Sequence, residues 1–526
     1  MTGSNYRWLE SIRLAPVADD SGRVIISNDA GPVARTSARV ADVLTHAIRA
    51  YPDIDADLIA QSVGGTAEAI ITVLASVGAL PALDGSLPNS TNRRLQFRKP
   101  FALQLTLLDP SRVLRLIPWL PALARTRGWW WASGALSATG LVFLLIFIVT
   151  PDSSLHQPLS VPQYGAVLAA LFLSVFIHEF AHATVLAAQG GTSKRLGVMI
   201  FYLAPAFFCD VSDAWRLPPI ARVKVALAGI VAQCTVASVA MIIAAFMQGT
   251  TGTACVVFGV MSYIFALFNL IPFVKLDGYI ALIGYLDRPN LRADAMVAFR
   301  RRMASLLLGT GRPKGRPESF GFLLFGALCV LFPVVLVGGF ALTVNSYLSS
   351  WGPIGAWITL GAFVIVIAIG AMQIKRILGQ LRRSGVGRIR SALVFGSAIA
   401  AVMMLAGILP LPVTVSGGVF TVHGDAAFVL VGATVGIEKG AVLSVYPSTA
   451  FPSTQLGEVD VTGGPSPCNV PLEAVTPLTG TGLHADGQCY PVTELHARPR
   501  TTIALLRASS ATLVQQLIFL ASRLHG

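Results

Sequence analysis

The chain has 526 residues, of which 54% are hydrophobic and only 12% are charged, and its mean hydropathy is +0.67. This composition excludes an ordinary soluble globular protein and indicates a polytopic, mainly helical membrane protein. The net charge of +13 does not indicate a nucleic-acid partner, because the Lys and Arg residues cluster in short loops between apolar runs, where they set membrane topology.

Residues 1–90 are predicted to form a small cytosolic domain. The segment RVIISN predicts a strand, and three later segments predict helices in a winged-helix-like order: TSARVADVLTHAIRAY, DADLIAQSVG and GTAEAIITVLASVGAL. No concentrated basic stripe accompanies them, so a peptide-docking or regulatory role is at least as well supported as DNA binding. The first residues lack the apolar segment that a signal peptide requires, so we expect the N-terminus in the cytosol.

Residues 91–130 are predicted to link this domain to the membrane. The segment begins with a basic patch made of Arg93, Arg94, Arg98 and Lys99. Residues 110–128 are rich in Arg and Pro, which predicts an amphipathic segment on the membrane surface.

Residues 131–410 are predicted to be the transmembrane domain. Seven apolar runs are long enough to span a bilayer: 131–150, 164–189, 221–247, 253–274, 320–344, 352–374 and 391–410. The loops at 151–163, 248–252 and 345–351 contain no Lys or Arg, whereas the loops that alternate with them contain many. We therefore expect a multi-pass protein of the cell membrane with a cytoplasmic N-terminus and an extracytoplasmic C-terminus.

Residues 411–526 are predicted to form an extracytoplasmic β-rich domain. Alternating stretches such as AAFVLVGATVG and AVLSVYP are typical of strands. The segment also contains Cys468 and Cys489, which are candidates for a disulfide because the space outside the cytosol is oxidising.

The second apolar run contains the motif His178-Glu179-Phe180-Ala181-His182. On a helix, His178 and His182 lie one turn apart on one face, so both imidazoles can bind one Zn²⁺. Glu179 lies beside them and is the candidate general base that takes a proton from water. A single buried histidine is usually an ordinary core residue. Two at this spacing, with a glutamate between them in apolar sequence, indicate a metal site, because unpaired ionisable groups are costly inside a membrane.

A catalytic zinc needs a third protein ligand, and Asp277 in NLIPFVKLDG is the best candidate. The alternative is an ordinary Asp-Gly turn at the membrane surface. Loop charge places Asp277 at the inner end of the fourth run. It also places His178 and His182 in the inner half of the second run, just before Lys194 and Arg195. We therefore expect the three side chains to lie at one depth and to form a zinc site.

HEFAH in a transmembrane segment, followed by N-x-x-P-x-x-x-L-D-G, resembles the site-2 protease family of intramembrane zinc metalloproteases. The resemblance covers about residues 164–290. It implies that His178, His182 and Asp277 bind zinc and that Glu179 activates the attacking water. It also implies that Asn269 positions the substrate or stabilises the oxyanion. No PDZ domain, which many members of the family carry, is recognisable in the sequence.

The stretch FYLAPAFFCDVSDAWRLPPIARVKVALAG resembles the peptide zinc metalloprotease branch of bacterial peptide-modification clusters, such as daptide-type clusters. Asp210 and Trp215 resemble fixed features of that branch, with no catalytic role assigned to them. The resemblance implies removal of the leader from a small, ribosomally made hydrophobic peptide, with the N-terminal domain holding the leader. One alternative is cleavage of a single-span regulator such as an anti-sigma factor. Another is a non-proteolytic metal transporter, which usually carries polar groups on more spans than this sequence offers.

Overall fold

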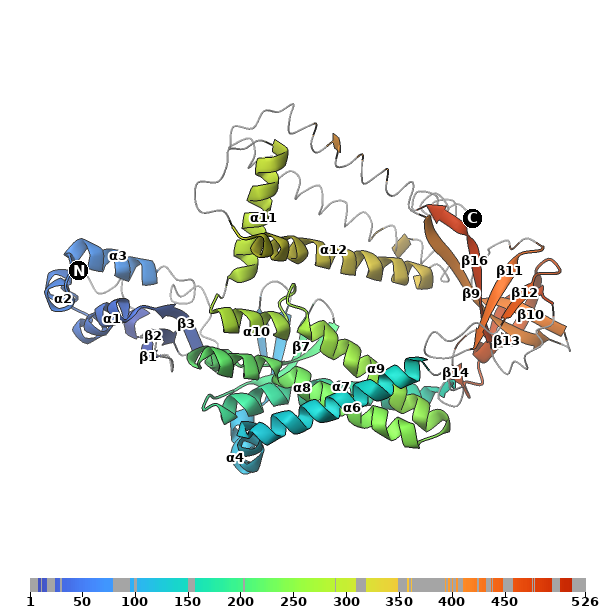
Figure 1. Cartoon of the computed structure of the whole chain (residues 1–526), viewed down its shortest axis with the longest axis horizontal. Coiled ribbons are helices and arrows are strands. Elements are labelled where there is room, and N and C mark those ends of the chain that lie inside the picture. Colours follow the sequence, from blue (N-terminus) through green and yellow to red (C-terminus); the bar gives the residue numbers. More distant parts are fainter. Residues whose placement is uncertain are drawn as a thin grey trace. The chain divides into compact units, whose positions relative to one another are not determined.

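The computed structural model is mostly helical, with β-sheets near both ends of the chain and within its middle part (Figure 1). Apart from isolated positions, it describes residues 8–10, 12–16, 24–28, 31–78, 95–98, 102–149, 157–201, 204–288, 290–308, 318–348, 410–422, 425–431, 439–447, 457–474, 478–493 and 502–512. The chain divides into two compact units. One comprises Met1–Val142, Ala169–Ile242 and Phe258–Pro289, and the other comprises Phe143–Leu168, Ile243–Val257 and Asn290–Gly526.

The N-terminal part of the first unit consists of an antiparallel sheet followed by three helices. The sheet has the order β1-β2-β3, and its strands are β1 (Arg13–Pro16), β2 (Val24–Asn28) and β3 (Gly31–Thr36). The helices are α1 (Ala38–Ala50), α2 (Ala56–Val63) and α3 (Ala67–Gly78). Ser37 and Asp55 cap the starts of α1 and α2 by accepting backbone hydrogen bonds, which explains why these helices begin there. The helices lie within the three segments predicted to be helical.

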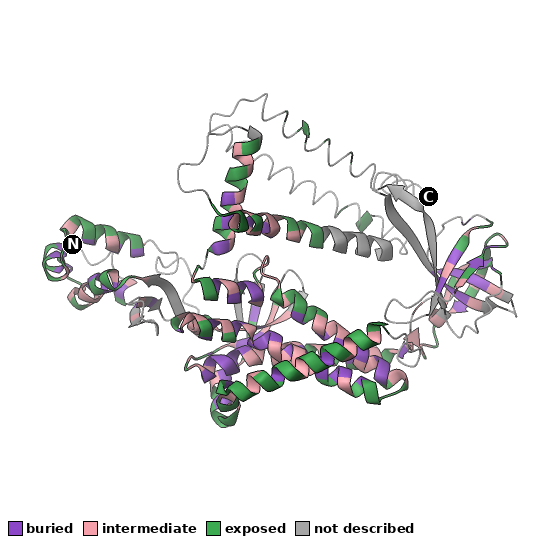
Figure 2. Cartoon of the chain, in the orientation of Figure 1, coloured by how far each residue is buried: buried purple, intermediate pink, exposed green. Residues whose placement is uncertain are grey.

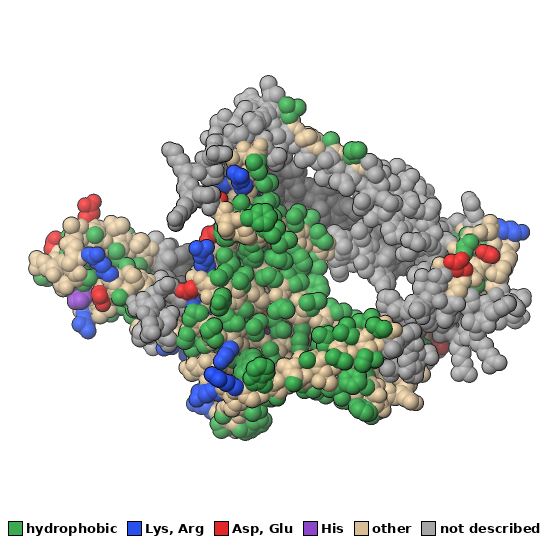
Figure 3. All heavy atoms as spheres, in the orientation of Figure 1, with side chains coloured by type: hydrophobic (Ala, Val, Ile, Leu, Met, Phe, Trp, Pro, Cys, Tyr) green, Lys and Arg blue, Asp and Glu red, His purple; other side chains and the backbone are tan. Residues whose placement is uncertain are grey.

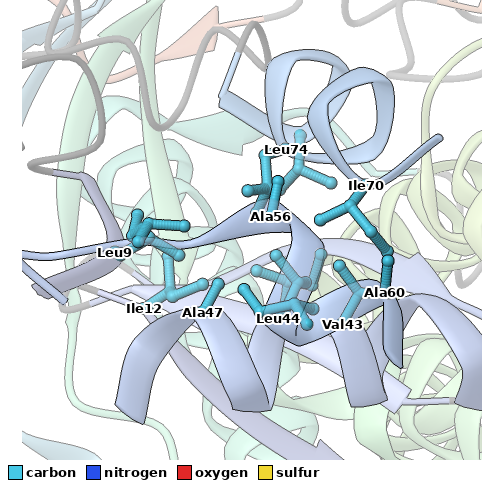
Figure 4. Packing of buried hydrophobic residues seen from close by; sticks show 13 residues of the cluster. Leu9, Ile12, Val43, Leu44, Ala47, Ala56, Ala60, Ile70 and Leu74 are labelled. Atoms are coloured by element: carbon cyan, nitrogen blue, oxygen red, sulfur yellow. The ribbon is translucent and has the colours of Figure 1, made fainter. Parts of the chain in front are cut away.

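A hydrophobic core holds these helices together (Figure 4). Leu44 of α1 and Leu74 of α3 are fully buried in it, and Ile59 of α2 and Ile70 of α3 are nearly so. The pair α2–α3 is apolar enough to be considered as one broken membrane span, but its axis bends by 102°. This angle is typical of a helix–turn–helix unit, and the shared core accounts for the apolar faces of both helices.

Four helices of the described chain are long and apolar enough to cross a membrane. They are α6 (Arg127–Val149), α7 (Val161–Ala188), α8 (Pro219–Phe246) and α9 (Gly249–Leu270), which correspond to the first four predicted spans. Figure 2 shows that α6 is largely exposed, and Figure 3 shows hydrophobic side chains gathered over the helical body. Such an extensive apolar surface fits contact with lipid.

The structure shows fewer spans than the seven predicted. The fifth prediction, 320–344, lies within helix α12 (Phe320–Leu348), whose stretch Phe320–Leu336 is apolar. The sixth and seventh predictions, 352–374 and 391–410, lie almost wholly outside the described residues. The structure therefore supports four spans in the part of the chain it describes.

A four-stranded antiparallel sheet accompanies the membrane helices of the first unit. Its order is β4-β5-β7-β8, with β4 (Leu95–Arg98), β5 (Ala102–Leu108), β7 (Leu196–Phe201) and β8 (Ala204–Cys209). Two of these strands lie within the predicted linker 91–130, so this segment is part of the folded body and not a simple connection. The amphipathic prediction for 110–128 corresponds to two short helices, α4 (Pro110–Leu116) and α5 (Trp119–Arg125).

The C-terminal part of the second unit is a seven-stranded sheet with the order β12-β11-β16-β9-β10-β15-β13. Its strands are β9 (Pro410–Val422), β10 (Asp425–Val431), β11 (Val442–Pro447), β12 (Gly457–Asp460), β13 (Ser466–Pro471), β15 (His484–Pro491) and β16 (Thr502–Thr512). Phe428, Leu443 and Tyr490 are fully buried in its core. A disulfide joins Cys468 of β13 to Cys489 of β15.

Candidate metal centre

The first two candidate ligands lie on α7, the second membrane helix. His178 and His182 are 4% and 5% exposed, and their rings meet edge to face with centroids 4.9 Å apart. The helix ends shortly afterwards at Ala188, whose carbonyl oxygen accepts a hydrogen bond from Nε of Arg125. A cation that bonds the last carbonyls stabilises a helix end, so α5 helps to hold the end of α7 nearest the motif.

The third candidate ligand is brought to the histidines by a sharp return of the chain. Helix α9 ends at Leu270, and Asp277 is the first residue of α10 (Asp277–Leu286). A Cβ atom on Gly278 would overlap the backbone of Leu270, so only glycine lets α10 begin this close to the end of α9. In the Asp-Gly pair, the aspartate therefore supplies a candidate ligand, and the glycine permits the close approach of the two helices.

The three side chains converge on a common point. The Nε2 atom of His178 lies 2.8 Å from Oδ2 of Asp277 and 3.2 Å from Nε2 of His182. The Nε2 atom of His182 lies 3.4 Å from the same Asp277 oxygen. Ligand atoms bound to one tetrahedral zinc are about 3.3 Å apart, as follows from bonds of about 2.0–2.1 Å. The observed separations thus fit a zinc ion held by two imidazoles and one carboxylate oxygen.

The far side of each imidazole is also fixed. Nδ1 of His182 donates to the backbone oxygen of Val225 at 2.7 Å, and Nδ1 of His178 lies 3.1 Å from Oε1 of Gln233. Both partners are on α8. When Nδ1 carries the proton, the lone pair is on Nε2, which is the atom that points to the common site. Acceptors placed behind metal-binding histidines in this way orient the rings and increase their basicity.

Helix α8 also leaves room for an ion. Gly229 faces the histidines, and a Cβ atom built on it would lie 2.5 Å from Nε2 of both His178 and His182. Any side chain at this position would therefore occupy the space next to the two candidate donor atoms. Together with the donor separations, this space shows that the residues present fit a bound metal.

Glu179 lies beside the ligands and next to the sheet. Its carboxylate lies close to the backbone N–H of Cys209, the last residue of β8. The rings of Phe176 on α7 and Phe207 on β8 pack edge to face with centroids 5.7 Å apart. Burial raises the pKa of the Cys209 thiol to about 12, so this cysteine stays protonated at neutral pH.

Asp277 is suited to bind a cation. Burial by itself raises the pKa of its carboxyl, but when His178 and His182 are protonated on both ring nitrogens, their hydrogen bonds outweigh burial and hold the pKa well below its usual range. The group is therefore a carboxylate at neutral pH.

Asn269 is the one predicted residue of the catalytic site without a described hydrogen bond to the other site residues. It lies one residue before the end of α9 and is partly buried. Among the described contacts, its side chain makes no hydrogen bond to the three ligands or to Glu179. Its predicted role toward substrate or oxyanion stays a prediction.

Sequence reasoning missed four contributors to the site: Gln233, Gly229, the Val225 carbonyl and the Cys209 amide. Of these, Gln233 could have been noticed in the sequence, because it is the only amide side chain in the 28 residues of α8. A polar amide in the middle of an apolar span usually has a specific partner. The other three act through backbone or through missing side-chain volume, which a single sequence does not reveal.

The chain matches no family model, no curated protein and no solved structure. Any conclusion on function therefore rests on the chemistry of this site: two imidazoles and one carboxylate that converge on one point, with a second carboxylate beside them.

Proposed function

We propose that this chain is an intramembrane zinc metalloprotease that hydrolyses a peptide bond. One observation carries the proposal. The donor atoms of His178, His182 and Asp277 all lie within 4.8 Å of one another, on elements far apart in the sequence, with Glu179 next to them. Three protein ligands and one free carboxylate are the usual complement of a hydrolytic zinc site.

The residues divide the chemistry between them. Bound zinc would polarise the substrate carbonyl and lower the pKa of water toward neutrality. Glu179 takes the proton of the attacking water and delivers it to the leaving amine, and the backbone N–H of Cys209 lies close to its carboxylate. Asn269 is proposed to orient the substrate or to donate to the developing oxyanion.

A helical substrate must unwind before cleavage, since its carbonyl groups are hydrogen-bonded within the helix. The four-stranded sheet offers a way to hold the unwound segment. Strand β8 lies at one edge of the described sheet, and its last residue contacts Glu179. An extended segment added to this edge would pass directly beside the general base. The sheet and the metal centre would then act as one site.

The proposed substrate is a small hydrophobic peptide made by the ribosome, from which the leader is removed. The resemblance of residues 201–229 to peptide-maturation proteases supports this choice. So does the N-terminal domain, which has its own core and is suited to hold a leader. A single-span regulator such as an anti-sigma factor is the alternative substrate. The proposed location is the cell membrane, with the N-terminus in the cytoplasm and the C-terminus outside.

The test is cleavage by the purified full-length protein in detergent and in liposomes, with products identified by mass spectrometry. Candidate substrates are any short hydrophobic peptide encoded beside this chain and a single-span regulator. Glu179→Gln should lower the cleavage rate by about 10²–10⁴-fold and leave the zinc content unchanged. Asp277→Ala should lose both zinc and activity, whereas Glu68→Gln on exposed α3 should change neither. Equal cleavage by the wild type and Glu179→Gln would contradict the proposal.

A further inference from the structure

We propose that Arg222 is a positioning residue for the metal centre. Its ion pair with Asp287 fixes helix α10 and thereby the third ligand, Asp277. The inference rests on the metal site proposed above, but not on proteolysis.

Arg222 and Asp287 form a buried contact between two elements of the site. Arg222 lies in the first turn of α8 and is 4% exposed. Its Nη1 atom lies 2.7 Å from Oδ1 of Asp287, the residue that ends α10. The helices are in close contact there, since a Cβ atom on Gly284 would lie 3.3 Å from Cβ of Arg222. The other end of α10 is Asp277, so the ion pair anchors the helix that carries the ligand.

The contacts close a ring around the metal centre. Val225 lies three residues after Arg222, on the same face of α8, and its carbonyl oxygen accepts a hydrogen bond from His182. His182 in turn lies 3.4 Å from Asp277. Helix α8 thus holds both histidines directly, through Val225 and Gln233. It holds Asp277 indirectly, through Arg222, Asp287 and α10. Because α10 is a single short helix, a shift at Asp287 is transmitted to Asp277.

The buried and only partly paired guanidinium of Arg222 indicates that this ion pair fixes the position of α10 more than it stabilises the fold. Nε and Nη2 of Arg222 are buried and have no hydrogen-bond partner among the described residues. The Trp215 ring lies 5.5 Å from the guanidinium carbon, and Asp287 supplies the opposite charge. A buried ion pair with unsatisfied donors contributes little net stability, whereas removal of one partner leaves an uncompensated charge. Both charges should therefore be removed together.

The test compares metal binding by the full-length protein and by Arg222→Met/Asp287→Asn. Asparagine tolerates the left-handed backbone of residue 287, where φ is 54°. We expect zinc affinity, measured by chelator competition, to fall about tenfold or more, the scale of changes in the support of metal ligands. The visible spectrum of bound Co²⁺ should also change, because its ligand geometry is altered. Thermal unfolding of the metal-free protein should change little.

Two further variants separate positioning from general stability. Arg222→Lys should keep most of the affinity, since only one guanidinium nitrogen is paired with Asp287. Arg216→Met removes another arginine of this region, one paired with Asp213 and outside the ring of contacts, and should have no effect. Wild-type zinc affinity and an unchanged Co²⁺ spectrum in the double variant would overturn the inference. A wild-type protein that binds no zinc would instead overturn the metal site itself.

Discussion

At the scale of single residues, the site depends as much on an absent side chain as on its ligands. Gly229 leaves open the space next to Nε2 of His178 and His182. The motif residues His178, His182 and Asp277 could be predicted from the sequence, because ionisable groups in apolar runs are rare and expensive. Gly229 could not, since a glycine in a membrane helix has many possible reasons.

Gly229→Ala is expected to weaken zinc binding by about 10–100-fold, the range seen when the surroundings of metal ligands are changed. The added methyl group would lie 2.5 Å from both donor nitrogens and force them apart. Zinc content after dialysis against a weak chelator measures the effect. Gly134→Ala in α6 is the matched control, because nothing lies within 4 Å of its Cβ position. Undiminished zinc binding by Gly229→Ala would show that the ion does not occupy this space.

Gln233 provides a second test at this scale, because its side-chain oxygen supports Nδ1 of His178. Gln233→Leu keeps the volume but removes the acceptor, and should weaken zinc binding by about 10–100-fold. Gln233→Glu keeps an acceptor at the same place and should retain most of the affinity. Zinc titration of both variants measures the effect. Equal zinc affinities of Gln233→Leu and Gln233→Glu would exclude this role for Gln233.

At the scale of elements, local patterns predicted helices better than strands. The apolar runs predicted helices α6 to α9 correctly, because each helix corresponds to one long continuous apolar stretch of the sequence. The sheet β4-β5-β7-β8 was not predicted, although ALQLTLL in β5 alternates as a strand does. Its partner β7 lies far along the chain, beyond two membrane helices. Gly197 of β7 also packs against the backbone of Leu105, a close approach that only the paired strands explain.

The N-terminal helices allow a prediction about the role of that domain. Leu74 of α3 is fully buried, so Leu74→Ala should destabilise the domain by about 2–5 kcal/mol. If the domain holds the leader, cleavage of a full precursor should slow, while zinc content and cleavage of a precursor shortened to the residues around the cleavage site stay unchanged. Urea denaturation and peptide assays measure both effects. Leu58→Ala, at a position 63% exposed, is the control for stability. Parallel loss of both cleavage activities would contradict a separate leader-holding role.

At the scale of the whole molecule, a small strand pair bears on topology. Strand β6 (Leu159–Ser160), directly before α7, pairs in parallel with β14 (Leu478–Thr479) of the C-terminal part. Gln163 also donates to Thr250, which joins the starts of α7 and α9. Strand β14 therefore lies beside the start of α7. The loop charges predict that the start of α7 and the C-terminus both lie outside the cell.

Labelling of intact cells tests this arrangement. A cysteine placed at Leu483, which is 61% exposed in the C-terminal domain, should react with a membrane-impermeant maleimide in intact cells. A cysteine placed at Leu58 in the N-terminal domain should react only after permeabilisation. The natural Cys468 and Cys489 should stay unlabelled until reduction, because they form a disulfide. Labelling of the Leu58 position in intact cells would contradict a cytoplasmic N-terminus.

By itself, the sequence predicted a membrane protein, the four helices that are long and apolar enough to span a membrane, and the residues of the candidate metal centre. These follow from hydropathy, loop charge and residue chemistry, all of which are local properties. Only the tertiary structure decided what supports the centre: α8 behind both histidines, β8 against Glu179, and α10 anchored through Arg222. Such contacts join segments that are distant in the sequence, often through backbone atoms or glycine. Their formation depends on how the helices pack, which no local pattern specifies.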